Sequence, residues 1–257
     1  MIDKIVRQKE HFDRIAGTYE DARRHPNHLL LKELIWHDFL ARHDELKKPG
    51  LRVLEAMCGF ADGKEILEKH LGIAIDYAGF DYSDAVVDTV RTKRPDLAVE
   101  RQDATRFSSE RRNDLVLLIG GLHHVPHVAG EVVRRLGETL GSGGLFISFE
   151  PTHGNRLFEK ARRCIYRKNP LFDQETERDF SLRELFGFFR AAGFELADVM
   201  YPGLLSYVLY YNPDAFPALN VGGARMVRAS YAIDRLFMRA SVGRAFSFAT
   251  LALWRKK

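Results

Sequence analysis

Residues 51–63, LRVLEAMCGFADG, constrain the fold of this chain more than any other stretch. An apolar run typical of a short buried strand leads into small residues that must turn sharply, and helical spacing begins at Lys64. A strand, a tight turn and a helix form the first half of a nucleotide-binding α/β unit. Small residues such as Gly59 let backbone N–H groups of the turn approach a ligand closely. An ordinary strand-to-helix connection is the alternative for this stretch alone.

After this unit, segments with strand patterns alternate with segments of helical spacing. Such alternation predicts right-handed crossovers and a mostly parallel sheet with helices on its faces, which is an α/β fold. The residues at 115–119 are all apolar and predict a fully buried strand. Strands are expected at 51–54, 73–81, 97–100, 115–121, 144–151, 194–200 and 246–254, and helices at 84–93, 131–140, 181–192 and about 224–239.

Two regions lie outside this alternation. Residues 1–48 are expected to form helices that cover the site, with a break at Pro26 and a second helical segment over 28–46. Residues 49–257 form the core, from which two cap segments, about 152–180 and 201–243, are expected to project over the ligand face.

Length and composition limit the number of domains, the kinds of partner and the expected location. A chain of 257 residues fits one large α/β domain, and a net charge of +4 with scattered basic residues gives no nucleic-acid signature. The N-terminus has no apolar signal core, and the longest apolar run, 115–122, is far too short to span a bilayer. With two cysteines only, a reducing, cytoplasmic location is expected, without integral membrane contact.

Acidic residues and glycines gather where the expected strands end. Ligands of parallel α/β sheets bind outside the carboxyl ends of the strands. The groups at these ends are 55–63, Asp81, Asp103, 119–124 and Glu150. Their convergence predicts one binding site at this edge of the sheet.

The chain resembles class I S-adenosylmethionine-dependent methyltransferases of the small-molecule type. The resemblance covers about residues 10–200 and the last strand. It implies a doubly wound, Rossmann-like, seven-stranded and mostly parallel sheet with an antiparallel last strand, N-terminal helices and a helical insertion before that strand. The matching stretches are VLEAMCGFADG, GFDYS at 79–83, RQDA at 101–104, NDLVLLIGGLHHV at 113–125, GGLFISFEP at 143–151, FDRIAGTYED at 12–21 and RAAGFELADV at 190–199.

The resemblance also implies roles for single residues. Asp81 would accept hydrogen bonds from two ribose hydroxyls, Asp103 would accept from the adenine amino group, and Glu55 with the turn would hold the amino-acid end of S-adenosylmethionine. Each could instead be an ordinary capping, turn or core residue. The expected cofactor-binding set is Tyr19, Glu55, Ala56, Gly59, Asp81, Tyr82, Asp103, Ala104, Ile119 and Gly120.

Two residues depart from the family's opening motif. Met57 and Ala61 stand where these methyltransferases usually have glycine. Alanine costs little there if its φ stays negative, and the Met57 side chain is expected to point away from the ligand. Met57 and Asp62 also argue against a GxGxxG dinucleotide fingerprint, and hence against a nicotinamide-dependent oxidoreductase.

Methyl transfer is an in-line displacement that depends mainly on holding two reactants in contact. A base is needed only if the acceptor loses a proton, and His123 and His124 are the catalytic candidates, with His127 behind them. No metal is expected, because no carboxylate or cysteine stands at ligand spacing to these histidines.

The caps are expected to roof a pocket for a small-molecule acceptor, with O-methylation favoured over N- or C-methylation. A nucleic-acid acceptor is disfavoured, and a methyltransferase-like binding protein without turnover stays open. The second cap could also form a homodimer interface or a peripheral membrane contact. The residues considered for the acceptor are Tyr207, Tyr210, Tyr211, Phe216, Arg156, Arg162, Arg163 and Arg167.

Overall fold

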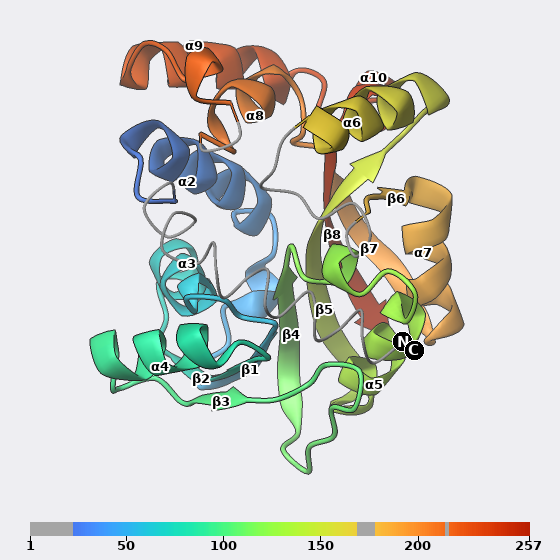
Figure 1. Ribbon diagram of the computed structural model, residues 1–257. Helices are drawn as coiled ribbons and strands as arrows, with labels where there is room; N and C mark the ends of the chain where they lie inside the picture. The colour runs from blue at the N-terminus through green and yellow to red at the C-terminus, as the bar shows by residue number, and fades with distance from the viewer. Residues whose placement is uncertain (1–22, 169–177, 214–215) are drawn as a thin grey trace.

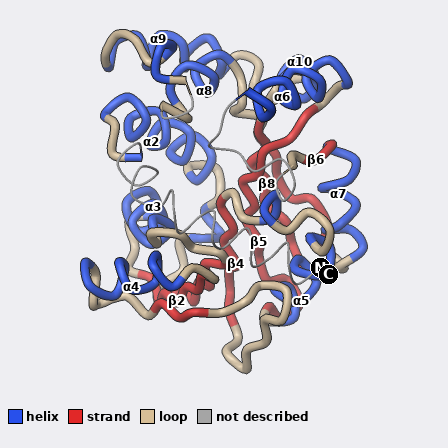
Figure 2. Tube along the Cα trace, in the orientation of Figure 1, coloured by secondary structure: helices blue, strands red, loops and turns tan. Residues whose placement is uncertain are grey.

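The computed structural model describes residues 23–168, 178–213 and 216–257. A twisted sheet runs through its centre in the order β3-β2-β1-β4-β5-β8-β7, and β6 pairs with β5 beside this path. Helices cover both faces (Figure 1 and Figure 2). The strands are β1 (Leu51–Ala56), β2 (Ile75–Asp81), β3 (Val99–Arg101), β4 (Asn113–Ile119), β5 (Leu140–His153), β6 (Phe180–Ser181), β7 (Phe194–Met200) and β8 (Ala249–Lys256).

The helices occupy the connections between strands and the two caps. The α-helices are α2 (Pro26–Leu40), α3 (Asp62–Leu71), α4 (Asp84–Lys93), α5 (Ala129–Glu138), α6 (Arg156–Lys168), α7 (Leu182–Ala191), α8 (Leu205–Tyr210), α9 (Ala224–Arg235) and α10 (Ser241–Phe246), and short 3-10 turns are η1 (Asp44–Leu46), η2 (Leu122–His124) and η3 (Pro217–Leu219).

The sheet has the predicted mixture of strand directions. Strands β1 to β5 pair in parallel, and β8 pairs antiparallel with both β5 and β7. The two-residue strand β6 is an addition to the seven expected strands. The strand order reverses between β1 and β4, so the chain leaves these neighbouring strands in opposite directions. A crevice opens at such a switch point, and this is where parallel sheets bind ligands.

Alternation along β4 divides the core between the two faces of the sheet. Leu115 and Leu117 belong to a buried cluster with residues of α2, α3, α8 and α9, whereas Val116 and Leu118 face a second cluster built from α5 and α7. Both faces are covered, so residues 115–119 of β4 can all be apolar, as the sequence predicted.

One expected break is confirmed, and several expected boundaries are wrong for local reasons. The break expected at Pro26 is present, at Arg24 and His25, and Pro26 itself begins α2. Proline suits this place because the first turn of a helix needs no N–H there, and His25 Nδ1 accepts from Asn27 N at 3.2 Å. The segment expected as one helix over 28–46 ends at Leu40, and η1 follows separately. The last strand begins at Ala249, where pairing with β5 starts, and Phe246 ends α10.

Two helix N-caps lie where serine residues are typical of a helix start. The Ser83 hydroxyl accepts from Val86 N at 3.2 Å, and the Ser181 hydroxyl accepts from Glu184 N at 3.2 Å, as the capping patterns predict. The spacing of Ser181 and Glu184 is typical of a capping box. The Glu184 carboxylate instead accepts from the Arg178 guanidinium, at 2.5 and 2.9 Å.

The turn after β1 adopts the left-handed backbone at three positions. Met57, Gly59 and Ala61 have φ angles of 52°, 52° and 60°. The negative φ that would make alanine inexpensive at position 61 is therefore not found. The surroundings hold the turn, because Cys58 N donates to Phe80 O at 2.9 Å and Arg94 donates to Ala61 O at 3.0 Å. Met57 and Ala61 are therefore held in a left-handed backbone conformation that usually favours glycine.

Among the residues that the structure describes, no helix combines the length and the apolarity that a bilayer crossing needs.

Replacing Ala61 by glycine should raise the free energy of unfolding by about 1 kcal/mol, because glycine adopts this φ without strain. Ala56→Gly is the matched control, since both alanines are fully buried and Ala56 lies in β1. That control should lose about 0.5–1 kcal/mol. Urea unfolding measures both, and equal losses in the two variants would contradict the account of the turn.

Candidate functional site

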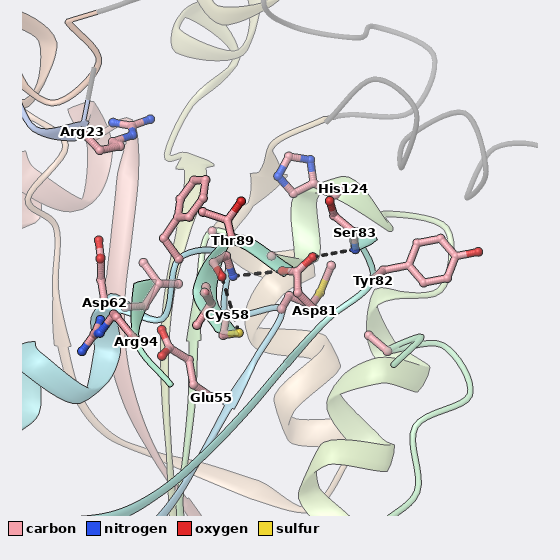
Figure 3. Close-up of a pocket in the computed structure, with 18 of the residues that line it drawn as sticks. Arg23, Glu55, Cys58, Asp62, Asp81, Tyr82, Ser83, Thr89, Arg94 and His124 are labelled. Atoms are coloured by element: carbon pink, nitrogen blue, oxygen red, sulfur yellow. Dashed lines mark hydrogen bonds between the residues drawn. The ribbon is translucent and has the colours of Figure 1, made fainter. Parts of the chain in front are cut away.

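A cavity of about 430 Å³ lies at the predicted edge of the sheet, beyond the carboxyl ends of β1, β2 and β4. Its walls come from the turn after β1, residues 81–83, the second half of α4, residues 102–104, residues 119–121 and residues 124–125. Helix α2 and Tyr211 enclose it from the side of the N-terminal region and the second cap. Figure 3 shows the lining side chains gathered around Asp81. Segments far apart in sequence thus share one ligand-sized space.

Asp81 ends β2 and is held by two backbone groups. Gly59 N donates to Oδ2 at 2.9 Å, and Ser83 N donates to Oδ1 at 3.0 Å (Figure 3). Each oxygen has a second lone pair, so the carboxylate can accept from two neighbouring hydroxyls. Burial raises the pKa of Asp81, and the hydrogen bonds from Ser83 and Gly59 oppose that rise. The site therefore offers a fixed acceptor pair with little water around it.

Asp103 lies in the loop that follows β3, in the cavity wall. Its Oδ1 accepts from the Thr105 backbone N and hydroxyl, both at 2.8 Å. This arrangement orients the carboxylate and leaves Oδ2 available to a donor in the cavity. Ala104 is buried beside it and leaves room for a flat group.

Glu55, at the end of β1, lies below the start of α3. Its Oε2 accepts from the Tyr77 hydroxyl at 2.5 Å, and both oxygens are 3.2 Å from Gly63 N. Burial raises the pKa of Glu55 to about 8. Glycine is required at position 63, since a Cβ there would lie 2.6 Å from the Glu55 carboxyl. Glu55 therefore ties the turn to α3 as well as lining the cavity.

Glu150, at the end of β5, organises the loop after β4. Its Oε1 accepts from Gly121 N and Leu122 N, both at 2.9 Å, and its Oε2 lies 3.2 Å from His123 Nδ1. The side chain is fully buried, which raises its pKa to about 7. Gly120 in this loop has a φ of 65° and, with Ile119, lines the cavity.

The two candidate catalytic histidines have different surroundings. His124 lines the cavity, whereas His123 is not among its lining residues and lies against Glu150. Their ring centroids are 3.9 Å apart. Protonated His124 would lower the pKa of both Asp81 and Glu150. His127 is exposed and does not line the cavity. Of the three histidines, only His124 can therefore contact a ligand in the cavity.

Tyr211 and His28 contribute aromatic rings to the cavity wall, and Tyr207 and Phe149 pack against Tyr211 without lining the cavity. Tyr211 stacks on Tyr207, with centroids 4.4 Å apart and an interplanar angle of 14°. Phe149 meets Tyr211 edge-on at 5.5 Å, and the His28 ring lies 5.1 Å away from Tyr211. A planar or apolar group would find ring faces and edges here.

His28 is a candidate that the sequence analysis missed. Its Nδ1 is 2.7 Å from Tyr211 O, and burial lowers its pKa well below the usual value. A carbonyl oxygen only accepts, so Nδ1 carries the proton and Nε2 keeps its lone pair. The sequence shows an isolated histidine on an apolar helix, which carries no signal without the contact to a residue 183 positions away.

Basic side chains that the sequence analysis also missed surround the start of α3. Lys32 pairs with Asp62, Arg94 donates to Ala61 O, and Arg23 donates to Tyr211 O at 2.5 Å. All three basic residues line the cavity. With the helix N-terminus they make this end of the cavity electropositive.

Other expected site residues lie elsewhere. Ala56 is fully buried in β1 and not part of the cavity wall, and Tyr210 is a core residue whose hydroxyl donates to Val221 O at 3.3 Å. Arg162 pairs with Asp179 and Arg163 with Glu159, so neither reaches the cavity. Tyr19 lies outside the described residues.

The turn after β1 contributes to the cavity wall. Met57 does not point away, because it lines the cavity and packs against Gly121. Gly59, Phe60 and Tyr82 also lie in the cavity wall. Within the described ranges, no group of three or more metal-ligating side chains comes together.

No family model matches this chain, and no curated protein matches it. Solved structures do. The chain is similar to an S-adenosylmethionine-dependent methyltransferase from Thermotoga maritima, described as a possible histamine N-methyltransferase, at 16% identity over 97% of this chain and 100% of that one, with a TM-score of 0.65.

Two further structures show the breadth of the similarity. An S-adenosylmethionine-dependent methyltransferase from Clostridium acetobutylicum has 12% identity over 86% of this chain and 90% of that one, with a TM-score of 0.57. The (4+2)-cyclase SpnF has 17% identity over 86% and 79%, with a TM-score of 0.56. The chain therefore has the class I S-adenosylmethionine-dependent methyltransferase fold, as the resemblance predicted.

Glu55 predicts a pH dependence of stability. A carboxyl whose pKa rises from 4.5 to about 8 on folding stabilises the protein below pH 4.5, and this contribution is lost as pH rises toward 8. Each pKa unit corresponds to about 1.4 kcal/mol. Glu55→Gln keeps the hydrogen-bonding shape and should flatten the decline of unfolding free energy between about pH 5 and pH 8.

Glu150→Gln is the matched control for this measurement. Burial raises the pKa of Glu150 to about 7, less than that of Glu55. Glu150→Gln should therefore reduce the decline of unfolding free energy with pH by a smaller amount than Glu55→Gln does. A Glu55→Gln profile as steep as that of the unsubstituted protein would contradict the burial of an uncharged Glu55.

Proposed function

We propose that this protein transfers the methyl group of S-adenosylmethionine to a small-molecule acceptor, with an oxygen as the acceptor atom. The observation that carries the proposal is the geometry of Asp81. Its carboxylate stands at the carboxyl end of β2, in the cavity wall, fixed by Gly59 N and Ser83 N and open to two further donors.

The residues around the cavity fit the cofactor part by part. Asp81 can accept from both ribose hydroxyls, and Asp103 Oδ2 can accept from the adenine amino group beside Ala104. Phe60 and Tyr82 supply apolar walls for the nucleoside. The carboxylate of the amino-acid end fits the electropositive start of α3, near Arg23 and Lys32. The cofactor, when bound, supplies a methyl group already activated by its sulfonium.

The chain's own contribution to the reaction is chiefly positioning. Asp81 and Asp103 fix one reactant at the strand ends, and the part of the cavity wall formed by Tyr211 and His28 receives the other. Holding two reactants in contact and in line can lower a barrier by about 7–11 kcal/mol. The aromatic walls favour an acceptor with a planar or apolar body.

An acceptor hydroxyl must lose its proton as the new bond forms. His124 faces the same cavity as Asp81 and is the base we favour, with the neutral Nε2 of His28 as the alternative from the acceptor end. His123 acts on this loop through Glu150 and not on the ligand.

Binding without methyl transfer is the second candidate function. SpnF has the same fold and is a cyclase, and Met57 occupies the cavity wall at a position where glycine is usual. This reading predicts cofactor binding without loss of its methyl group. We place the protein in the cytoplasm, where the free thiols of Cys58 and Cys164 would stay reduced.

Replacing Asp81 by alanine should weaken S-adenosylmethionine binding about ten- to hundredfold, because hydrogen bonds to a charged group contribute roughly 1.5–3 kcal/mol. Asp88→Ala on the exposed side of α4 is the matched control and should bind normally. Isothermal titration calorimetry measures both. An unchanged affinity in the Asp81 variant would remove this residue from the site.

Deuterated methyl from labelled S-adenosylmethionine should appear in a small molecule when the protein is incubated with a metabolite extract. Mass spectrometry identifies the labelled product, and purified acceptor then gives rates for variants. His124→Ala should slow transfer about 100-fold or more without changing cofactor affinity, whereas His28→Ala should slow it only if His28 is the base. Tight cofactor binding with no labelled product would favour the second candidate function.

A further inference from the structure

Exposed apolar side chains gather at one end of the molecule. Among the described residues, twelve large hydrophobic side chains are exposed, and ten of them lie in or between α6, α8, α9 and α10. Figure 1 shows these four helices along one end, beyond the sheet. We call this end the cap surface. Its members are Leu157, Leu205, Leu219, Val221, Met226, Ile233, Leu236, Phe237, Val242 and Phe246.

Helix α9 has two separate apolar sides. Val227 and Tyr231 are buried against α2 and belong to the core. Met226, Ile233 and Leu236 recur at helical spacing on another side and are 54%, 51% and 74% exposed. The second stripe makes no contribution to the core and remains in contact with water.

Basic residues border this stripe. Arg225 and Arg235 each precede a stripe position by one residue, and Arg228 follows Arg225 by three residues, so the three arginines share the adjoining side of the helix. Arg235 pairs with Asp38 at 2.8 Å, whereas Arg225 and Arg228 are exposed. The cap surface therefore combines exposed arginine with exposed aliphatic side chains.

Acidic residues are nearly absent from this part of the sequence. Residues 216–246 contain five arginines and one acidic residue, Asp234. That carboxylate is buried and accepts from Leu205 N at 3.2 Å and Ser206 N at 2.7 Å, so it holds α8 in place. Arg235 and Arg239 pair with Asp38 and Asp198 from outside this range, and Arg225, Arg228 and Arg244 are exposed.

We propose that the cap surface docks onto an anionic lipid membrane. The apolar stripe of α9 enters the boundary between headgroups and acyl chains, and Arg225 and Arg228 contact lipid phosphates and anionic headgroups. The contact is peripheral, and it does not rest on the proposed methyl transfer.

The basic charge of the cap surface favours an anionic membrane over a second copy of the chain as its partner. A symmetric dimer through the cap surface would bring the arginines of one copy close to those of the other, with no exposed acidic partner within 216–246. An anionic bilayer supplies both the apolar layer and the opposite charge. The combination of stripe and basic side is typical of helices that lie in a membrane interface.

Sedimentation with lipid vesicles tests the proposal on the full chain. The protein should bind vesicles of equal parts phosphatidylcholine and phosphatidylglycerol at least tenfold more strongly than phosphatidylcholine alone, since each arginine near an anionic surface contributes about a fivefold effect. The double variant Ile233→Glu/Leu236→Glu should lose at least tenfold in binding to the anionic vesicles.

A charge variant and a control complete the test. Arg225→Glu/Arg228→Glu should reduce binding to anionic vesicles and leave binding to neutral ones unchanged. Leu196→Glu changes an exposed leucine of β7 outside the cap surface and should bind as the unsubstituted protein does. Thermal melts followed by circular dichroism confirm that every variant is folded.

Two results would overturn the proposal. One is equal or undetectable binding to both kinds of vesicle. The other is a concentration-dependent dimer, measured by analytical ultracentrifugation, that Ile233→Glu/Leu236→Glu abolishes while vesicle binding is absent. The second result would assign the cap surface to another copy of the chain.

Discussion

The site depends on the connection that Asp81 makes between two strand ends. One of its oxygens accepts from Gly59 N in the turn after β1, and the other accepts from Ser83 N at the start of α4. These bonds fix the turn against β2 and hold the carboxylate in the cavity wall at the carboxyl end of that strand. A buried carboxylate without such donors would be costly, so the backbone geometry around it is tightly determined.

The central fold could be predicted because its determinants are local. Apolar runs fix β1 and β4, and serines at 83 and 181 mark helix starts whose capping bonds are present. Predictions failed where a pattern had two meanings. The helical spacing over 28–46 covers both α2 and the separate turn η1, and the aromatic run before Ala249 is typical of a strand although Phe246 ends α10.

The candidate site could be predicted where parallel strands alone bring its residues to one edge of the sheet. The carboxyl ends of parallel strands meet at one edge, so the positions of Asp81, Asp103 and Glu55 followed from the expected strands. Contacts between distant segments gave no such signal. The placement of His28 against Tyr211 and the left-handed backbone at Ala61 depend on the whole packed structure.

A crystal structure of the chain with S-adenosylhomocysteine would test the central claim most directly. The account predicts both ribose hydroxyls within hydrogen-bonding distance of the Asp81 carboxylate, with the bonds from Gly59 N and Ser83 N retained. The adenine would lie beside Ala104, with its amino group at Asp103. A nucleoside bound elsewhere, or a cavity that stays empty at saturating ligand, would contradict it.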